Sequence, residues 1–324
     1  VGARQMNSHG EIYETKYGLT TSQRLYGTVT ENREGRGPCY LKTDEISAAQ
    51  EQDLYRAYLN MAPSQTLKWL EGSRGPASEN VEIEGTEPYI VGGHTASGYW
   101  VDNGRRTTVK GLFAAGDVAG GCPQKYVTGA LAEGESMTKY LKNLNADSEK
   151  SNAIKEIETK IDNASILKKK EYEAHLTAEG KDSEDTFFIT AEQLEEAMQK
   201  VMDQYAGGIA TDYQYNEERL VIGKKRIGEL LDMIDELKAK DMFELKDIYE
   251  VRERLIVCQT LIEHLRARKE TRWHSFGENT DYPEESNQWL KYVNSKRKPD
   301  GGTEIIFREL VTGGKVYECT DFTE

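Results

Sequence analysis

Residues 111–134 read GLFAAGDVAGGCPQKYVTGALAEG, and this stretch carries the most informative pattern in the 324-residue sequence. Small and apolar residues lead into the dipeptide Gly116-Asp117, and a glycine-rich turn follows. Thr128-Gly129-Ala130 then suits the first turn of a helix. The order predicts a strand over 109–115, a flexible turn, and a helix that begins near Gly129. This is the strand–turn–helix unit of an α/β protein.

The same unit would suit a flavin. Small residues let the backbone approach a cofactor closely, and the Asp117 carboxylate can accept hydrogen bonds from ribityl hydroxyls. The helix N-terminus offers N–H groups and partial positive charge, which would stabilise the negative charge that develops at flavin N1 and O2 on reduction. An ordinary strand–turn–helix unit with a turn aspartate explains the pattern equally well, so spacing alone does not name a flavin.

Composition divides the rest of the chain into regions. Residues 1–103 are mixed and turn-rich, with helical patterns over 44–61 and 64–71. Residues 147–324 are highly charged and mostly helical. Within them, 150–170 is polar almost all round and suits a solvated helix or a linker. Apolar residues recur at three- and four-residue spacing, as packed helices require, over 191–205, 217–237 and 246–268, and short strands are predicted over 303–310 and 315–319.

Charge and cysteine content exclude several classes of protein. A net charge of −14 argues against general affinity for nucleic acid, which needs clustered Lys and Arg. The sequence contains no run of about 18 apolar residues, so we predict no membrane-spanning helix. The four cysteines, at positions 39, 122, 258 and 319, lack Cys-x-x-Cys spacing, so we predict no metal site and no cysteine-bound cluster. Scattered cysteines are most simply reduced thiols of a cytoplasmic protein.

Several short motifs occur in a fixed order along the chain. They are REGRGP at 33–38, TEPY at 86–89, GH at 93–94, GLFAAGDVAG at 111–120, TGALAEG at 128–134, YAGG at 205–208, RKETRW at 268–273 and RKPDG at 297–301. In these motifs the chain resembles the fumarate reductase/succinate dehydrogenase flavoprotein family, and within it the adenylylsulfate reductase alpha subunits. The resemblance implies an α+β fold in three parts. They are part of a capping domain at 1–103, the second FAD-binding segment of an α/β domain at 104–146, and a mostly helical carboxyl-terminal domain at 147–324.

The resemblance also implies which residues contact FAD. These are Gly116, Asp117, Lys125, Thr128, Gly129, Ala130 and Leu131. The family's pyrophosphate-binding GxGxxG loop does not occur in the 324 residues, so the AMP half of FAD has no cradle here. We therefore expect a carboxyl-terminal part of a longer enzyme, which alone binds FAD weakly or not at all and is inactive.

His94 and three arginines are the candidate substrate residues. His94 lies in GGHTASG at 92–98, which resembles the family's HxxxG element, whose histidine binds a substrate carboxylate. Arg36 could grip a carboxylate, sulfate or phosphate in a bidentate manner, and Arg24 and Arg33 are weaker candidates. The alternatives are a turn histidine bonded to backbone and surface arginines that steady a Gly/Pro loop.

The residues after the flavin turn differ from both relatives. Fumarate and succinate enzymes resemble HGANR there, whereas this chain has QKYVT at 124–128 and lacks that Arg. Adenylylsulfate reductases resemble GHKFSSGSHAEG, and here Gln124 and Leu131 replace the two histidines while Lys125 and Gly129 agree. Gln cannot become a cation, so it would stabilise sulfite or sulfate less well. The general chemistry therefore transfers better than the substrate.

Three functions follow as hypotheses. The first is two-electron transfer between FAD and a small oxyanion substrate. In adenylylsulfate reductase the flavin N5 takes part in a sulfite adduct, and adenylylsulfate is interconverted with AMP and sulfite. The resemblance implies an iron–sulfur partner subunit. The second is a fumarate-reductase-like reductase of an organic acid that uses the same FAD and His94. The third is a non-catalytic module that binds other subunits.

Other notable side chains are expected to be structural or exposed. Arg268, Glu270 and Arg272 with Trp273 suit a charged helix end followed by a docked aromatic ring. We also expect two structural histidines, His264 and His274, and two exposed ones, His9 and His175.

Overall fold

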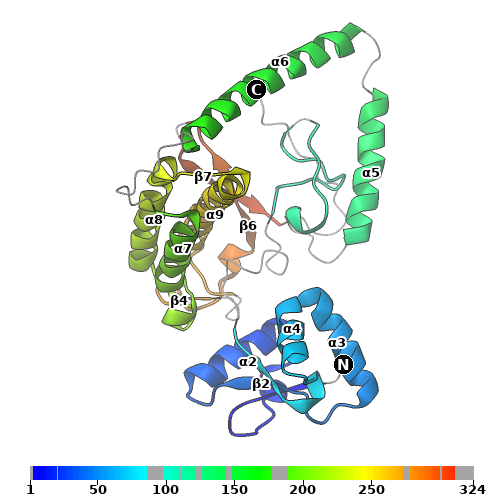
Figure 1. Ribbon diagram of the computed structural model, residues 1–324, viewed down its shortest axis with the longest axis vertical. Helices are drawn as coiled ribbons and strands as arrows, with labels where there is room; N and C mark the ends of the chain where they lie inside the picture. Colours follow the sequence, from blue (N-terminus) through cyan, green and yellow to red (C-terminus); the bar gives the residue numbers. More distant parts are fainter. Residues whose placement is uncertain are drawn as a thin grey trace. The chain divides into compact units, whose positions relative to one another are not determined.

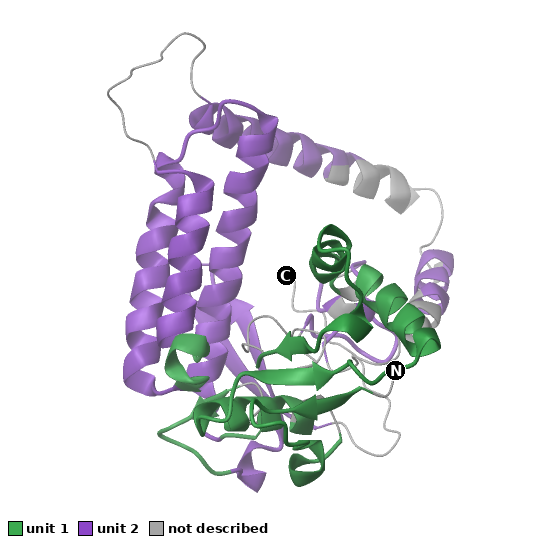
Figure 2. Ribbon diagram, turned by 60° about the horizontal axis from the view of Figure 1, so that its bottom comes forward, with its two compact units in different colours: residues 1–87, 207–214, 271–284 green, residues 88–206, 215–270, 285–324 purple. Residues whose placement is uncertain are grey.

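The computed structural model describes residues 3–19, 21–85, 98–109, 111–120, 126–143, 148–176, 189–272, 277–299 and 301–310. The chain forms two compact units (Figure 2). Unit 1 comprises Val1–Glu87, Gly207–Gln214 and Thr271–Glu284, and unit 2 comprises Pro88–Ala206, Tyr215–Glu270 and Glu285–Glu324. Two short segments of the predicted helical region therefore belong to unit 1, and 88–103 belongs to unit 2.

Unit 1 is built on a small antiparallel sheet (Figure 1). Its order is β1 (Arg4–Met6), β2 (Cys39–Lys42) and β3 (Val81–Ile83), with β2 in the middle. The helices α1 (Glu14–Tyr17) and α2 (Thr21–Arg33) lie beside it, and α2 packs on β2. The Arg36 loop joins α2 to β2, so its position depends on the end of α2.

A helical hairpin completes the first segment of unit 1. It consists of α3 (Ala48–Met61) and α4 (Pro63–Glu71), followed by the 3-10 turn η1 (Pro76–Ser78). The α3 helix begins later than predicted because Ser47 caps it through a capping box with Gln50. The buried Trp69 ring packs at 5.4 Å from Tyr55 and 5.1 Å from Tyr58, which joins the two helices.

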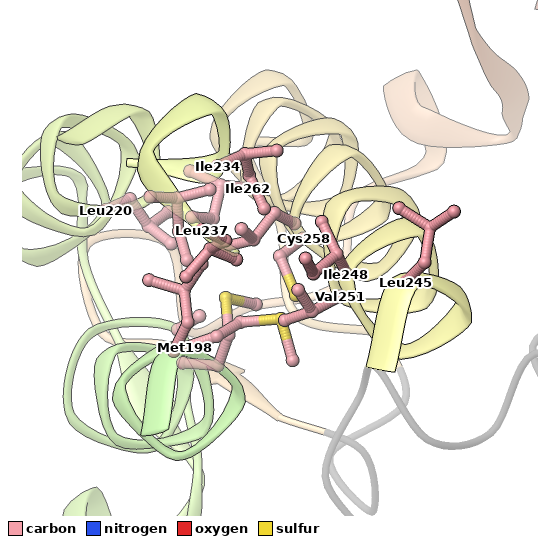
Figure 3. Close-up of a cluster of buried hydrophobic side chains, with 14 of the residues drawn as sticks. Met198, Leu220, Ile234, Leu237, Leu245, Ile248, Val251, Cys258 and Ile262 are labelled. Carbon is pink, nitrogen blue, oxygen red and sulfur yellow. The ribbon is translucent and has the colours of Figure 1, made fainter. Parts of the chain in front are cut away.

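Unit 2 contains a three-helix bundle made of α7 (Ala191–Tyr205), α8 (Glu217–Asp232) and α9 (Met242–Ala267). Figure 3 shows apolar side chains from these helices and the connecting turns meeting in one core. The predicted helix over 191–205 is confirmed. The next ends at Asp232, before the 3-10 turn η4 (Ile234–Glu236), and α9 begins at Met242 because Asp241 caps it by accepting from two backbone N–H groups.

A long helix and a strand hairpin complete the C-terminal half of unit 2. The helix α6 (Ser148–His175) confirms a helix over 150–170, and its described side chains from 155 to 170 are exposed. His175 is buried, so the prediction of an exposed ring is wrong: α6 ends there against the bundle, with Nδ1 2.9 Å from the Leu237 oxygen. His9 is exposed as predicted.

The hairpin pairs β6 (Lys291–Arg297) with β7 (Thr303–Glu309), which confirms the strand predicted over 303–310. The strand predicted over 315–319 lies outside the described residues. Short elements link these parts: η3 (Ile209–Thr211), the paired strands β4 (Gln214–Tyr215) and β5 (Glu278–Asn279), and η5 (Asn287–Trp289). Among the described residues, no helix is long and apolar enough to cross a membrane.

Candidate flavin and anion-binding site

The segment before the Gly116-Asp117 turn is not the strand that the sequence predicts. Leu112 N donates to Val109 O at 3.0 Å, and Gly111 has a φ of 82°, so the chain folds back here instead of extending. The described part of this segment pairs only through an isolated bridge between Arg106 and Phe113. The expected strand over 109–115 is therefore replaced by a tight turn.

The Gly116-Asp117 turn itself forms the 3-10 turn η2 (Gly116–Val118), and Gly116 has a φ of 75°. This left-handed conformation favours glycine, because a Cβ would crowd the following carbonyl. The side chain of Asp117 lies outside the described part of the structure. The predicted turn is thus present, with a glycine where the backbone requires one.

Gly98 and Gly120 let the end of the GGHTASG stretch lie against the backbone that follows this turn. Tyr99 N donates to Val118 O at 2.7 Å, and Gly120 N donates to Tyr99 O at 2.9 Å. A Cβ on Gly98 would lie 2.6 Å from Val118 O, so only glycine allows this approach. The end of the GGHTASG stretch therefore lies beside the Gly116-Asp117 turn. His94 itself lies outside the described residues.

The helix that follows the turn is α5 (Tyr126–Asn143), which packs against η2. The rings of Phe113 and Tyr140 meet edge to face at 6.1 Å. A Cβ on Gly104 would lie 2.5 Å from Ser136 Oγ, so the 102–105 turn also touches this helix closely. The loops before η2 thus hold α5 in place.

The first two turns of α5 hold four of the predicted flavin contacts. Thr128, Gly129, Ala130 and Leu131 have helical backbone there, while their side chains, and all of Lys125, are outside the described residues. The helix begins at Tyr126 and not near Gly129, where the sequence predicts its start. Because only the first turn has backbone N–H groups without an intrahelical acceptor, Thr128 is the one residue of these four that offers such a group. A left-handed glycine turn, a close backbone approach and a helix N-terminus could together hold a flavin.

A buried ion pair that sequence analysis missed supports this region. Asp102 is buried, and its carboxylate accepts from the Arg106 backbone N and Nε, both at 2.9 Å. The pair closes the turn between Val101 and Thr107, which form an isolated antiparallel bridge. An Asp and an Arg four residues apart outside a helix gave no pattern by which to predict it.

In unit 1, Glu31 of α2 is the centre of the arginine cluster. Its side chain is 2% exposed. Arg36 grips the carboxylate with Nε at 2.6 Å and Nη2 at 2.7 Å. Asn7 Nδ2 and Tyr17 OH also donate to it, at 2.9 and 2.7 Å, and Lys16 Nζ lies 3.3 Å away. These hydrogen bonds, that of Arg36 above all, hold the pKa of Glu31 well below its usual range against the opposing effect of burial.

The three candidate arginines therefore have different surroundings. Arg36 also contacts Glu34, so its guanidinium is engaged by two carboxylates. Arg33 donates to Glu278 Oε2 at 3.1 Å and to Asp212 O at 2.8 Å. Arg24 lies 3.7 Å from Glu14, and its buried Nε has no hydrogen-bond partner among the described residues. All three lie in unit 1, on α2 or the loop after it, and the flavin segment lies in unit 2.

The charged end of α9 has the structural role that its sequence suggests. Glu270 is buried and accepts from Arg268 Nη1 at 2.6 Å and from Ser286 N at 3.0 Å. Arg268 also donates to the carbonyl oxygens of Trp289 and Lys291. This network joins the end of α9 to the start of β6. Trp273 and His274 lie outside the described residues.

His264 is half-buried on α9, with Nε2 2.9 Å from Ser295 Oγ. Desolvation by burial, with a smaller effect of Arg268, lowers the pKa of this histidine. In the part of the chain that the structure describes, no three His, Cys, Asp or Glu side chains could hold a metal ion together.

Comparisons with known proteins find sequences that are similar to this chain over most of its length. The chain is 28% identical over 340 residues to the alpha subunit of adenylylsulfate reductase from Megalodesulfovibrio gigas, covering 92% of this chain and 50% of that one. It is 26% identical over 226 residues to an uncharacterised FAD-dependent oxidoreductase of Methanocaldococcus jannaschii, covering 65% of this chain and 37% of that protein. No protein-family model matches.

Solved structures give the same result. Adenylylsulfate reductase from Archaeoglobus fulgidus superposes with a TM-score of 0.73 at 26% identity, covering 96% of this chain and 56% of that one. The E. coli quinol fumarate reductase subunit FrdA superposes with a TM-score of 0.65 at 16% identity, over 98% of this chain and 56% of that one, which shows a common fold. The chain thus spans about half the length of the adenylylsulfate reductase subunits that it matches.

Proposed function

Because this chain is homologous to the alpha subunit of adenylylsulfate reductase, we propose that it forms part of an FAD-dependent oxidoreductase acting on a small oxyanion substrate. The match over 92% of the chain carries the proposal. FAD, when bound, would supply two-electron chemistry, and the protein would supply orientation and charge placement around it. We also propose that the protein is cytoplasmic, because its cysteines are scattered as reduced thiols usually are.

Residues of the Gly116 turn and the first turns of α5 would hold the flavin. The left-handed Gly116 and the close approach of Gly98 to Val118 give a turn without side-chain bulk. Asp117 would accept hydrogen bonds from ribityl hydroxyls. The N–H group of Thr128, in the first turn of α5, would donate to the negatively charged edge of a reduced flavin, and Gly129 and Ala130 would let the cofactor approach the helix closely. Lys125 and Leu131 flank these positions.

His94 and the arginines Arg36 and Arg24 are two separate candidates for binding the substrate anion. His94 precedes Gly98, which lies beside the flavin turn. Arg36 holds the buried Glu31 with Nε and Nη2, so an anion would contact its Nη1, and a pre-organised guanidinium loses less conformational entropy on binding. Arg24 Nε has no hydrogen-bond partner among the described residues, so Arg24 could add a further contact. An iron–sulfur partner subunit would exchange electrons with the flavin.

The test is flavin retention by two aspartate variants of the purified flavin-containing protein. Asp117→Ala should lower the flavin content per polypeptide well below that of the parent. Asp53→Ala on α3 is the matched control, since Asp53 is an exposed partner of Arg56, and its flavin content should be unchanged. Equal flavin in both variants would remove Asp117 from the site.

Substrate assays then separate the candidate reactions. Activity with AMP plus sulfite, and none with fumarate, is the expected result for an adenylylsulfate reductase. Reduction of fumarate or a similar acid without activity toward AMP and sulfite would instead support an organic acid reductase. Stable binding of other subunits by a protein that never holds flavin would refute the enzyme proposal.

A further inference from the structure

Arg33 joins three segments of unit 1 that are far apart in the sequence. It is the last residue of α2, and its guanidinium donates to Glu278 Oε2 at 3.1 Å and to Asp212 O at 2.8 Å. Gln214 Nε2 also donates to Glu278 Oε2, at 3.2 Å. The segments 207–214 and 271–284 are thereby tied to the end of α2.

The backbone that Arg33 holds is strained. Asp212 and Tyr213 have φ values of 52° and 61°, so two consecutive non-glycine residues are left-handed. This conformation is sterically unfavourable for residues other than glycine and is uncommon for a bulky side chain such as Tyr. Such a turn persists only when its surroundings hold it, and strained turns of this kind gather at functional sites.

Several hydrogen bonds supply that support. Tyr213 N donates to Gly208 O at 3.0 Å, and Tyr213 O accepts from Glu278 N at 2.9 Å. The Arg33 bond to Asp212 O is charge-assisted, so it is among the strongest of them. Arg33 is 28% exposed and Glu278 16% exposed in their side chains, so water screens the pair only in part.

The strained turn places Tyr213 against α2. The Tyr213 side chain is buried, and a Cβ on Gly85 would lie 2.7 Å from its OH and 2.5 Å from Val29 Cγ2. Tyr213 and the α2 residue Val29 therefore meet at Gly85. Arg33 and Tyr213 attach the same turn to α2 at two places, one turn of the helix apart.

We propose that Arg33 is a positioning residue, not an anion ligand: with Glu278 it locks the left-handed Asp212–Tyr213 turn onto α2. The lock fixes the end of the helix and the loop that carries Arg36 immediately after it. The expected effect of Arg33 on anion binding rests on the proposed function, in which Arg36 is an anion ligand. Its structural part stands on the contacts of Arg33 alone.

The primary test is hydrogen exchange of the 324-residue chain. Arg33→Gln should speed exchange in peptides covering 207–214 and 277–282 on the order of tenfold, because a hydrogen-bonded charged group is lost. Peptides of the α7–α9 bundle should not change. Arg33→Lys should give an intermediate effect, since an ammonium is a point charge without the guanidinium fork.

The matched control is Arg74→Gln. Arg74 forms an exposed ion pair with Glu79 in the same unit, at 2.7 Å, and its loss should leave exchange over 207–214 as in the parent. Unchanged exchange in Arg33→Gln, or an equal rise in the control, would overturn the lock. If Arg33→Gln fails to fold, Arg33→Lys decides by the same comparison.

A binding measurement separates this inference from the proposed function. Calorimetric titration of the purified flavin-containing protein with sulfite should show weaker binding, by a few-fold, in Arg33→Gln, and loss of binding in Arg36→Gln. Loss of binding in Arg33→Gln with unchanged exchange would make Arg33 the anion ligand and overturn the proposal. A parent protein that binds no sulfite would count against the proposed substrate, while hydrogen exchange still decides the lock.

Discussion

The interior of unit 1 beside α2 is polar, whereas the interior of the α7–α9 bundle in unit 2 is almost entirely apolar. The buried polar side chains of unit 1 include Gln5, Asn7, Glu14, Thr28 and Glu31. The bundle buries a continuous set of aliphatic side chains and methionines, among them Leu194, Met202, Leu220, Ile227, Leu255 and Ile262. The same chain thus uses two kinds of core.

The difference indicates what each interior does. Apolar burial is non-directional and stabilises in proportion to area, so a bundle core chiefly provides stability. Hydrogen-bonded charges are directional and are costly when a partner is lost, so they specify one arrangement. The candidate anion ligands Arg24 and Arg36 pair with two buried carboxylates of this polar interior, Glu14 and Glu31.

The largest expected effect comes from the apolar core. Leu255→Ala should lower the free energy of unfolding by about 3.5 kcal/mol, because Leu255 is 0% exposed and its removal leaves a cavity. Urea denaturation followed by far-UV circular dichroism measures this. Val257→Ala on the same helix is the control, since Val257 is 61% exposed, and it should change stability by less than about 0.5 kcal/mol. Equal effects would contradict the assignment of the core.

A somewhat smaller effect is expected from the polar interior. Glu31→Gln should destabilise unit 1 by about 2 kcal/mol, because the hydrogen bonds from Arg36, Asn7 and Tyr17 lose their charged acceptor. Hydrogen exchange of α2 and β1 amides reports on unit 1 alone. Glu34→Gln is the control, since Glu34 is 49% exposed and contacts the same Arg36. A control as damaging as Glu31→Gln would mean that burial is not the cause.

The stability that Glu31 gives to unit 1 should depend on pH. The folded pKa of Glu31 is below its ordinary value of 4.5, so the folded state binds fewer protons than the unfolded state in that range. The stabilisation is therefore fully present above about pH 4.5 and is lost as pH falls toward the folded pKa. Glu31→Gln should remove this part of the acid dependence of α2 exchange.

The secondary structure could be predicted from the sequence where apolar residues recur with a regular spacing. The α7 span follows from apolar spacing, and Thr190 with Gln193 forms the capping box that begins it. The apolar run over 109–115 predicts a strand, and this prediction is wrong because Gly111 adopts a left-handed conformation and the chain turns there. A short apolar run does not reveal whether a neighbouring strand exists.

The candidate site was predictable only in part. The Gly116 turn and the helix after it follow from the order of small residues and appear in the structure. Glu31 was missed because nothing in TENREGRGP distinguishes a buried carboxylate from an exposed one. The bond of Arg33 to Glu278 joins residues 245 positions apart, which no local pattern encodes.

The smallest expected effect concerns His264 in unit 2. Its folded pKa is below the ordinary 6.5 because burial disfavours the cation. The unfolded state therefore binds more protons below pH 6.5, and the stability of the bundle should fall as pH drops from there toward the folded pKa. His264→Gln removes the titration but can still bond Ser295. Urea denaturation between pH 7 and 5 should show a flatter profile for this variant, and an identical slope would contradict the assignment.

The most direct test of the proposed function is the intact mass and absorbance spectrum of the protein purified from its native source. We predict flavin absorbance bands that co-purify with a polypeptide containing this sequence. A polypeptide that contains this sequence and has a mass well above 36.7 kDa, yet shows no flavin absorbance even after refolding with excess FAD, would contradict the proposed oxidoreductase.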